Sequence, residues 1–446
     1  MTSDEIEKEF SEIASYGGND PMNSFRSILK GNILTLIWTR MVLFFSLRSY
    51  SSYFPLYIIA LGGSPQEIGL VTSMGAITAL IVVPIAGYLA DTRGRVRVIA
   101  SAHFFRSITY LIYMLSRNWV WLAIGTFYDG LTQYNHAALS AVIADSVPPE
   151  QRAAGFAATN TLHEIVSMVG PIVGAYVITV SGIDLGMRYL FAIAIISMWI
   201  IGIGRWKFLT ETLTTSSSSI PHRQSVVAII KASYKSVWET IKWTPRGLVG
   251  FVSIEALSTF AGAMVGPFWV LYAKDIINLT ISEWSLILFA EGLVRLFLSI
   301  PAGMIADKVG NRKIILVTLF LSLFPGLLFT LYCKTFLQAL AVMLFLTTVV
   351  AFMSPATSAF MANMIPRELR ARVNSAYGRG MIGVRRGARG AVAGYVMTAP
   401  SWLGSIVGGF MYSVNPTYPW LIQMGILFLC WIIGMRAIKE PKIREV

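Results

Sequence analysis

Polar side chains recur at the spacing of a helix face within one apolar run of the sequence, residues 119–144. Asp129, Gln133 and His136 follow one another at intervals of four and three residues, which places them on one side of an α-helix. An ionisable group at membrane depth costs roughly 2.5–3.5 kcal/mol, so it normally faces a partner or a water-filled cavity. The spacing therefore indicates a polar stripe with a function inside an apolar environment.

Other apolar runs carry ionisable residues too, namely Arg48 in 33–60, Glu164 in 154–180, Glu255 in 248–273, and Glu291 with Arg295 in 284–306. Desolvation at the membrane midplane raises the pKa of a carboxyl group, and a nearby arginine lowers it again. A carboxylate under both influences can gain a proton on one side of a membrane and lose it on the other. We expect Asp129 or Glu164 to do so, ahead of Glu255 and Glu291. Arg48 or Arg295 is then the competing charge or a contact for a bound small molecule.

The alternative is structural. Arg40, Arg48 and Arg106 would pair with Asp129, Glu164 and the other acids as salt bridges that only hold the helices together. Arg106 fits this alternative best. In the run 284–306, Glu291 and Arg295 lie one helical turn apart and can pair with each other.

The elements that position these residues are membrane-spanning helices. The chain has 446 residues, of which 55% are hydrophobic and 13% charged, whereas soluble domains average roughly 25% charged. Apolar runs near the roughly 20 residues needed to cross a bilayer recur twelve times. They are 33–60, 67–90, 97–115, 119–144, 154–180, 188–204, 248–273, 284–306, 314–332, 336–362, 393–413 and 419–437. We expect an all-α membrane protein with these twelve spans.

The charges predict how the chain sits in the bilayer. The first thirty residues are polar and acidic, without a signal peptide, and most of the 36 lysines and arginines fall in segments on the same side as that tail. This bias places both termini in the cytoplasm. The net charge of +13 is thus a matter of topology, and no nucleic-acid partner is expected.

Several kinds of site find no support in the sequence. Cys333 and Cys430 lie in no metal spacing, and no GxxxxGK[ST] loop occurs. The substring GRGMIG at 378–383 follows a membrane helix rather than a strand, so it is not a dinucleotide site. No metal and no cofactor are expected, and the chain is not expected to be an enzyme.

The sequence contains an internal repeat. The stretch VPIAGYLADTRGRVRVIA at 83–100 is repeated as AGMIADKVGNRKIIL at 302–316. Gly87, Asp91 and Gly94 correspond to Gly303, Asp307 and Gly310, each 216 residues further on. The repeat divides the chain into a tail (1–31), a six-helix half (32–204), a central loop (205–247), a second six-helix half (248–437) and a tail (438–446). Paired repeats of this kind are typical of secondary transporters, in which substrate lies near the midplane between the halves.

The repeated motif resembles the signature of the major facilitator superfamily, which is glycine, three residues, aspartate, a basic residue, one residue, glycine and further basic residues. The residues that carry it are Gly87, Asp91, Arg93, Gly94 and Arg95 in the first copy and Gly303, Asp307, Lys308, Gly310, Arg312 and Lys313 in the second. The first copy departs at Thr92, where the family has a basic residue. The resemblance implies two bundles that rock about a central site. It also implies that Asp91 lies near the N-terminal end of helix 11 and biases the inner gate without touching substrate.

A second motif favours a subclass. Gly170, Pro171 and Gly174 resemble the glycine-proline signature of the family's drug/proton antiporters, although small residues at this spacing also serve close helix packing. The arginine expected in helix 4 is absent, since Thr126 stands there. The resemblance implies proton-coupled efflux of amphipathic compounds by a monomer in the cell membrane. An organic or phosphorylated anion suits the arginines as an alternative substrate, and a non-transporting sensor of the same fold is a third possibility.

Two segments are irregular. In the central loop, residues 224–243 have the apolar positions and lysines of an amphipathic helix on the inner membrane surface, with a solvated connector as the alternative. From Arg152 to Gly170 the first half spans 18 residues, whereas the matching stretch from Arg370 to Gly404 spans 34. The 16 additional residues precede helix 11 as a glycine- and arginine-rich stretch, which we expect to be a cytoplasmic loop in contact with anionic headgroups.

Overall fold

The computed structural model describes residues 30–147, 152–212, 226–366, 369–378, 380, 382–384 and 394–438. Helices are the regular structure of these residues, which contain no strand. The predicted all-α fold is therefore confirmed. Eight helices in the described ranges are long and apolar enough to cross a membrane.

The first half consists of α3 (Gly31–Ser51), α4 (Phe54–Ala60), α5 (Pro65–Arg93), α6 (Arg95–Met114), α7 (Trp119–Leu131), the short helix η1 (Gln133–Asn135), α8 (His136–Asp145), α9 (Arg152–Ser167), α10 (Gly170–Ser181) and α11 (Ile183–Phe208). Three of its predicted spans are broken into consecutive helices: α3 with α4, α7 with α8, and α9 with α10.

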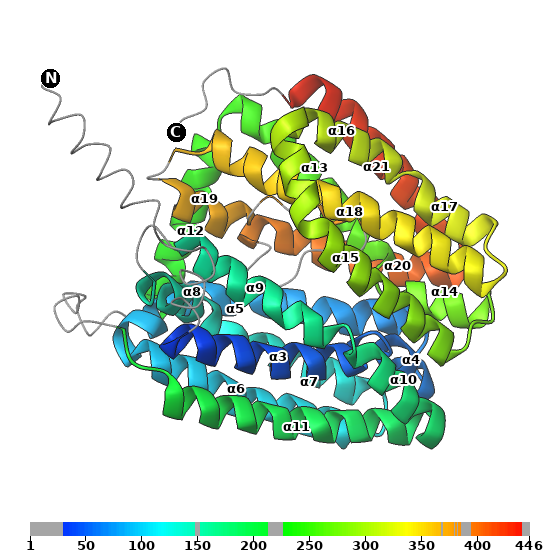
Figure 1. Cartoon of the computed structure of the whole chain (residues 1–446), viewed down its shortest axis with the longest axis horizontal. Helices are drawn as coiled ribbons and strands as arrows, with labels where there is room; N and C mark the ends of the chain where they lie inside the picture. The colour runs from blue at the N-terminus through cyan, green and yellow to red at the C-terminus, as the bar shows by residue number, and fades with distance from the viewer. Residues whose placement is uncertain are drawn as a thin grey trace, which may run out of the picture.

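The second half follows the same order. It consists of α13 (Arg246–Val265), α14 (Trp269–Asp275), α15 (Ile281–Val309), α16 (Asn311–Leu321), α17 (Phe324–Leu331), α18 (Phe336–Met364), α19 (Arg370–Tyr377), α20 (Gly394–Val414) and α21 (Tyr418–Ala437). Between the halves lies α12 (Val226–Trp243). In Figure 1 the first half, blue to green, lies below the second, green to red.

Matching residues shape the two halves alike. Capping boxes start α5 at Ser64 and α15 at Thr280, where each hydroxyl accepts a bond from the helix backbone. The repeated motif ends each of these helices at a glycine, Gly94 with φ 86° and Gly310 with φ 98°. Since other residues avoid this left-handed region, the motif's last glycine is required by the turn into the next helix.

The halves meet along two pairs of helices. α5 packs along α20, and α10 packs against α15. They also approach each other near α4 and α14, on the right of Figure 1. There a Cβ added to Gly69 would lie 2.5 Å from the carbonyl oxygen of Ser405, and one added to Gly409 would lie 2.6 Å from that of Pro65. Small residues thus let the two bundles touch backbone to backbone at this end.

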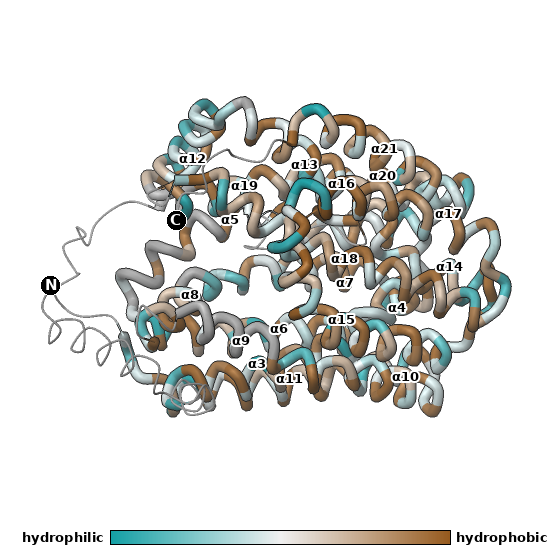
Figure 2. Tube along the Cα trace, turned by 45° about the horizontal axis from the view of Figure 1, so that its top comes forward, coloured by the Kyte–Doolittle hydropathy of each residue, from teal (hydrophilic) through white to brown (hydrophobic). Residues whose placement is uncertain are grey.

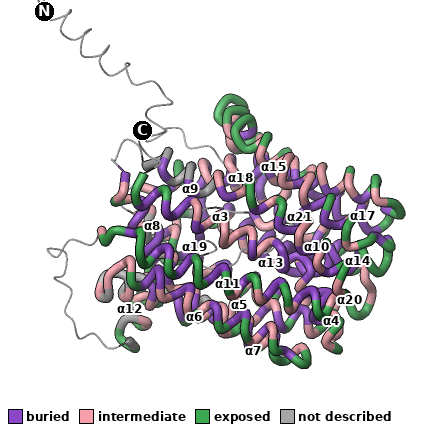
Figure 3. The backbone as a smooth tube through the Cα atoms, turned by 60° about the horizontal axis from the view of Figure 1, so that its bottom comes forward, coloured by how far each residue is buried: buried purple, intermediate pink, exposed green. Residues whose placement is uncertain are grey.

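Apolar side chains also face outward. Trp199, Ile203 and Trp206 on α11 are exposed, and hydrophobic residues recur along this outer helix (Figure 2). Buried and exposed residues alternate along it in Figure 3. Such exposure over many helices is unlike a water-facing surface and fits a belt in contact with lipid.

The central loop contains a helix, as one of its two interpretations predicted. α12 packs against α5 and α19, and the ring of Tyr234 contacts that of Tyr395 edge-on with centroids 5.9 Å apart. Lys231, Lys235 and Trp238 are exposed on it. An amphipathic helix therefore lies across the end of the bundle where the repeated motif is found. Its contact with lipid stays a prediction.

The segment before α20 is described in part, and its predicted contact with anionic headgroups stays a prediction. Of its residues, Ile382 and Val384 are buried in the second half. The Nε2 of Gln423 on α21 donates to the carbonyl oxygen of Val384 at 2.5 Å, and the N–H of Gly383 donates to the Oγ of Ser258 on α13 at 3.3 Å. Burial of the two apolar side chains is favourable. The side chains of Gln423 and Ser258 make hydrogen bonds to the backbone carbonyl and N–H groups that are buried with them. Residues 385–393, with the arginines, lie outside the described ranges.

Candidate functional site

One carboxylate lies between arginines from both halves of the protein. The Oε2 of Glu164 on α9 lies 3.9 Å from the Nη2 of Arg48 on α3 and 4.0 Å from the Nη1 of Arg295 on α15. The Oε1 of the same carboxylate lies 3.6 Å from the Nε2 of His163. The sequence prediction offered Arg48 or Arg295 as the competing charge for Asp129 or Glu164, and in the structure both arginines lie beside Glu164.

A small cavity opens beside this carboxylate. It has a volume of about 20 Å³, and among the residues that line it are Arg48, Glu164, Glu291 and Arg295. We call it the charged cavity. Glu291, one turn before Arg295 on α15, is only 2% exposed, whereas the side chain of Glu164 is 31% exposed. The cavity thus holds two acids and two arginines at the contact between the halves.

The glycine-proline motif builds one wall of the charged cavity. A Cβ on Gly170 would lie 2.7 Å from the carbonyl oxygen of Phe45, and one on Gly174 would lie 1.8 Å from that of Ser49. These glycines therefore let α10 press against α3 just beside Arg48, with Pro171 in the first turn of α10. From the other half, Gly292 packs against Met168 at the junction of α9 and α10, where an added Cβ would be 2.7 Å away.

Asp129 and Gln133 belong to a different cluster. Arg106 on α6 donates to both oxygens of Asp129, from Nε to Oδ1 at 2.8 Å and from Nη2 to Oδ2 at 3.1 Å. The Nε2 of Gln133 donates to the same Oδ2 at 3.2 Å. All three residues lie in the first half, and none lines the charged cavity. This arrangement is the structural pairing that the sequence offered as the alternative role of Asp129.

The two remaining candidates lie on α8 and α13. His136 is half-buried at the start of α8. Glu255 is 1% exposed on α13, one turn before Ser258, which bonds to the buried segment ahead of α20. Neither residue lines the charged cavity.

Sequence reasoning missed a buried arginine. Arg205, near the end of α11, is 0% exposed. Its Nε donates to the Oγ1 of Thr39 at 3.0 Å, and its Nη1 bonds to the Nε2 of His103 at 2.6 Å. The predicted span ended at residue 204, so Arg205 was counted with the central loop. Two basic residues in the last turn of an apolar helix, Arg205 and Lys207, would have been the signal only if the helix were known to run on to Phe208.

The first copy of the repeated motif forms contacts inside its own half. Arg95 pairs with Asp145 at the end of α8, and its Nη1 donates to the Oγ1 of Thr212 at 2.9 Å. The carboxylate of Glu211 accepts from the backbone N–H groups of Arg95 and Val96 at 3.2 and 3.1 Å, where a negative charge suits a helix N-terminus. The side chains of Asp91 and Arg93, and the surroundings of Gly87, lie outside the described residues.

The second copy is more open. Asp307, Lys308, Arg312 and Lys313 are exposed, and the Nη2 of Arg312 donates to the carbonyl oxygen of Met435 at 3.4 Å. A Cβ on Gly303 would meet nothing within 4 Å. Close packing inside this half therefore does not explain Gly303 in the arrangement seen here.

Comparison with known families agrees with the repeat and the helical fold. The family model described as Major Facilitator Superfamily matches residues 36–258 and again residues 251–446. The chain belongs to this superfamily. It is thus a multi-pass integral membrane protein of the cell membrane, in a family of transporters.

Among named relatives, the multi-drug resistance efflux pump PmrA of Streptococcus pneumoniae is 26% identical over 288 residues, which cover 62% of this chain and 67% of that protein. The multidrug resistance protein MdtG of Salmonella schwarzengrund is 25% identical over 284 residues, covering 60% of this chain and 65% of that protein. The matched stretches thus span about two thirds of these relatives.

Solved structures share the fold at lower identity. The nucleoside transporter NupG superposes with a TM-score of 0.67 at 15% identity, covering 92% of this chain and all of that chain. A bacterial homologue of the lysosomal transporter Spinster, in an inward-facing and occupied conformation, gives 0.66 at 14% identity, with 95% and 98% covered. These likenesses concern the fold alone.

Proposed function

We propose that this protein is a secondary active transporter that exports amphipathic, drug-like compounds in exchange for protons by alternating access. The observation that carries the proposal is the position of Glu164, one carboxylate within 4.0 Å of an arginine from each half. Because the ion pairs of Glu164 reach both halves, the charge on this one carboxylate influences how the two halves are positioned relative to each other.

The charge on Glu164 sets the strength of that link. When ionised, the carboxylate attracts Arg48 in its own half and Arg295 in the other. A proton on Glu164 removes both attractions, so Arg295 and its half are free to separate from α9. A cationic compound that enters between the acids competes with the arginines in the same way. Proton and substrate thereby compete for one carboxylate, and either one releases the link between the halves, which is the requirement for exchange.

The names of relatives support export of drug-like compounds. PmrA and MdtG are named for multidrug resistance, and a tetracycline resistance protein of Pasteurella multocida is 22% identical over 262 residues. The glycine-proline motif beside the charged cavity points to the same subclass. Coupling to protons rests on Glu164 and its surroundings.

Transport in reconstituted vesicles tests the proposal. With ethidium as the probe and an imposed pH gradient, we expect Glu164→Gln to lower gradient-driven ethidium movement at least about tenfold, which corresponds to roughly 1.4 kcal/mol. The control is Asp184→Asn, which removes an exposed ion pair within α11 and should leave transport unchanged. Full gradient-driven movement by Glu164→Gln would contradict the proposal.

A second candidate is transport of an organic or phosphorylated anion. Arg48 and Arg295, one from each half, lie within 4.0 Å of the same carboxylate oxygen, so the carboxylate of a substrate could take the place of that of Glu164. Arg48→Gln and Glu164→Gln separate the two candidates. An anion carrier should lose binding of its anion in Arg48→Gln and keep it in Glu164→Gln, whereas the exporter should lose binding of ethidium in Glu164→Gln.

A further inference from the structure

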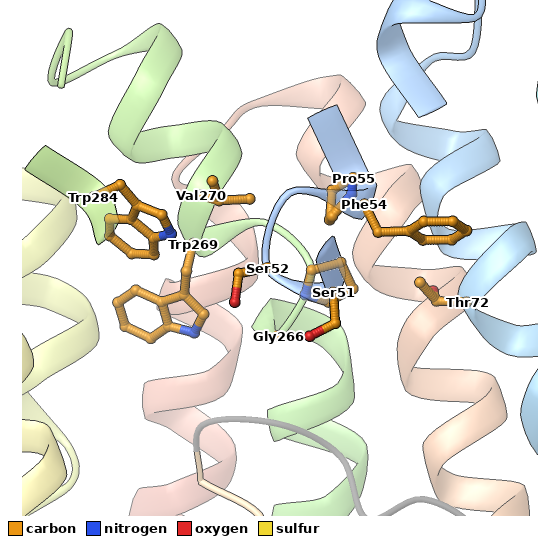
Figure 4. Close-up of a pocket in the computed structure, with 10 residues that line it drawn as sticks. Ser51, Ser52, Phe54, Pro55, Thr72, Gly266, Trp269, Val270 and Trp284 are labelled. Carbon is orange, nitrogen blue, oxygen red and sulfur yellow. The ribbon is translucent and has the colours of Figure 1, made fainter. Parts of the chain in front are cut away.

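A second cavity lies where the first span of each half is broken. It has a volume of about 100 Å³ and lies between the α3–α4 break and the α13–α14 break. We call it the aromatic cavity. Its lining includes Ser51, Ser52, Phe54, Thr72, Trp269 and Trp284 (Figure 4).

Two buried polar atoms at this cavity lack a protein partner. Among the described residues, neither the Nε1 of Trp284 nor the Oγ of Ser52 makes a hydrogen bond, although the two residues are only 3% and 8% exposed. Figure 4 shows the nitrogen edge of Trp284 turned toward Ser52. An unmet buried donor costs roughly 1–3 kcal/mol, so a ligand that supplies an acceptor gains by binding here.

The polarity of these atoms specifies the ligand's chemistry. An indole N–H only donates, and a hydroxyl donates or accepts, so the matching group is an oxygen acceptor such as a carbonyl. The wall formed by Trp269 is flat and held in place by other rings, since the centroid of the Trp269 ring lies 4.9 Å from that of Phe329 and 5.4 Å from that of Trp420. The volume is smaller than the roughly 150 Å³ cavity that takes benzene, so the cavity holds one edge of a flat compound.

Ser52 connects this cavity to the candidate site. It lines both the aromatic cavity and the charged cavity, and Arg48 is one turn earlier in the same helix. A compound with a flat carbonyl end and a cationic end can therefore reach Trp284 at one end and Glu164 and Glu291 at the other.

We propose that the aromatic cavity binds the neutral, carbonyl-bearing edge of the transported compound, with that oxygen accepting from the N–H of Trp284. The cationic end of the same compound points toward the two acids that line the charged cavity. This inference rests on the proposed function and adds to it a substrate class, flat amphipathic cations that carry a ring carbonyl.

Two matched probes test it on the purified full-length protein in detergent. One is an acridone with a dimethylaminopropyl chain, and the other is the dihydroacridine in which CH₂ replaces the ring carbonyl. We expect the wild type to bind the acridone about fivefold more tightly. Trp284→Phe keeps the ring and removes the donor, so the two affinities should agree within about twofold.

The control is Trp402→Phe. It removes another buried indole N–H without a partner among the described residues, but one that does not line the aromatic cavity, and it should keep the preference. If Trp284→Phe does not fold, Ser52→Ala should weaken acridone binding about twofold and leave the dihydroacridine unchanged.

The proposal is overturned if the wild type binds neither probe, if it shows no preference because water alone occupies the cavity, or if Trp284→Phe keeps the preference. The measurement uses no gradient, so it is independent of the vesicle assay on Glu164→Gln. A preference without proton-driven transport would support the binding site and reject the exchange mechanism. Proton-driven transport without a preference for the acridone would support the exchange mechanism and reject the binding site.

Discussion

Two arginine–carboxylate clusters lie inside the protein, and they differ in geometry. Arg106 holds Asp129 with two hydrogen bonds of 2.8 and 3.1 Å, both within the first half. Glu164 lies 3.9 and 4.0 Å from its two arginines, one of which belongs to the second half. The first is a paired fork of the kind that fixes a geometry. The second lies beyond hydrogen-bond distance, so its members are near one another without being locked.

This difference in geometry indicates that the Arg106–Asp129 pair is structural and that the ion pairs of Glu164 are labile. Breaking up the Arg106 pair would leave a charge in a site where both side chains are less than a fifth exposed, so that cluster favours one arrangement of α6 and α7. The Glu164 cluster loses little when one arginine moves away, because another remains and solvent reaches all three side chains. A protein whose halves must separate needs its labile contacts between them and its fixed ones within them.

The largest expected effect is on Asp129. Asp129→Ala leaves the guanidinium of Arg106 buried without its carboxylate, and loss of one partner of a buried pair costs roughly 3–5 kcal/mol. We expect little folded protein, measured by size-exclusion chromatography of a fluorescent fusion and by thermal unfolding in detergent. Asp184→Asn, at an exposed pair, is the control. A stability equal to that of the wild type would mean that the Arg106 fork does not hold the first half together.

The next effect concerns the contact between the halves. Gly409→Ala would place a Cβ 2.6 Å from the carbonyl oxygen of Pro65, and such overpacking costs roughly 1–3 kcal/mol. Because the strain is relieved when the halves part, we expect a shift away from this arrangement, measured as longer distances between spin labels on α5 and α20. Gly425→Ala is the matched control, since its Cβ would meet nothing within 4 Å. Equal distances in both variants would contradict this reading of the interface.

A smaller effect is expected for the stability of Glu164→Gln. Its ion pairs are long and about a third of its side chain is exposed, and exposed pairs contribute at most about 1 kcal/mol. Thermal unfolding of this variant should therefore stay close to the wild type even though transport falls. A loss as large as that of Asp129→Ala would place Glu164 among the structural charges.

Much of the fold was predictable because it depends on local pattern. Apolar runs of bilayer length and the repeated motif act within a few turns of chain, and the motif ends α5 and α15 at Gly94 and Gly310. Pairing of Arg106 with Asp129 was also foreseeable as one of two alternatives, since a buried arginine needs an acid.

Other features depend on distances between helices that no local pattern contains. Arg295 was named both as a possible partner of Glu291 and as the competing charge for Asp129 or Glu164. It lies 4.0 Å from Glu164 in the other half, and only packing of α15 on α9 and α10 decides that. Burial of two residues in the segment before α20 depends on packing in the same way. Its glycines and arginines indicated a basic loop, but Ile382 and Val384 found partners inside the second half.

The smallest expected effect sharpens the comparison most. A double-mutant cycle on Glu164 and Arg295, using glutamine at each position, should give a coupling energy of about 0.5 kcal/mol that falls at high salt as screening increases. The same cycle on Asp129 and Arg106 should give several times more and depend little on salt, because solvent reaches that pair less. Thermal unfolding of the single and double variants at two ionic strengths measures both cycles. A strong, salt-insensitive coupling between Glu164 and Arg295 would mean that the halves are held by a fixed bridge, and a carboxylate fixed in that way could not release one half from the other when it takes up a proton.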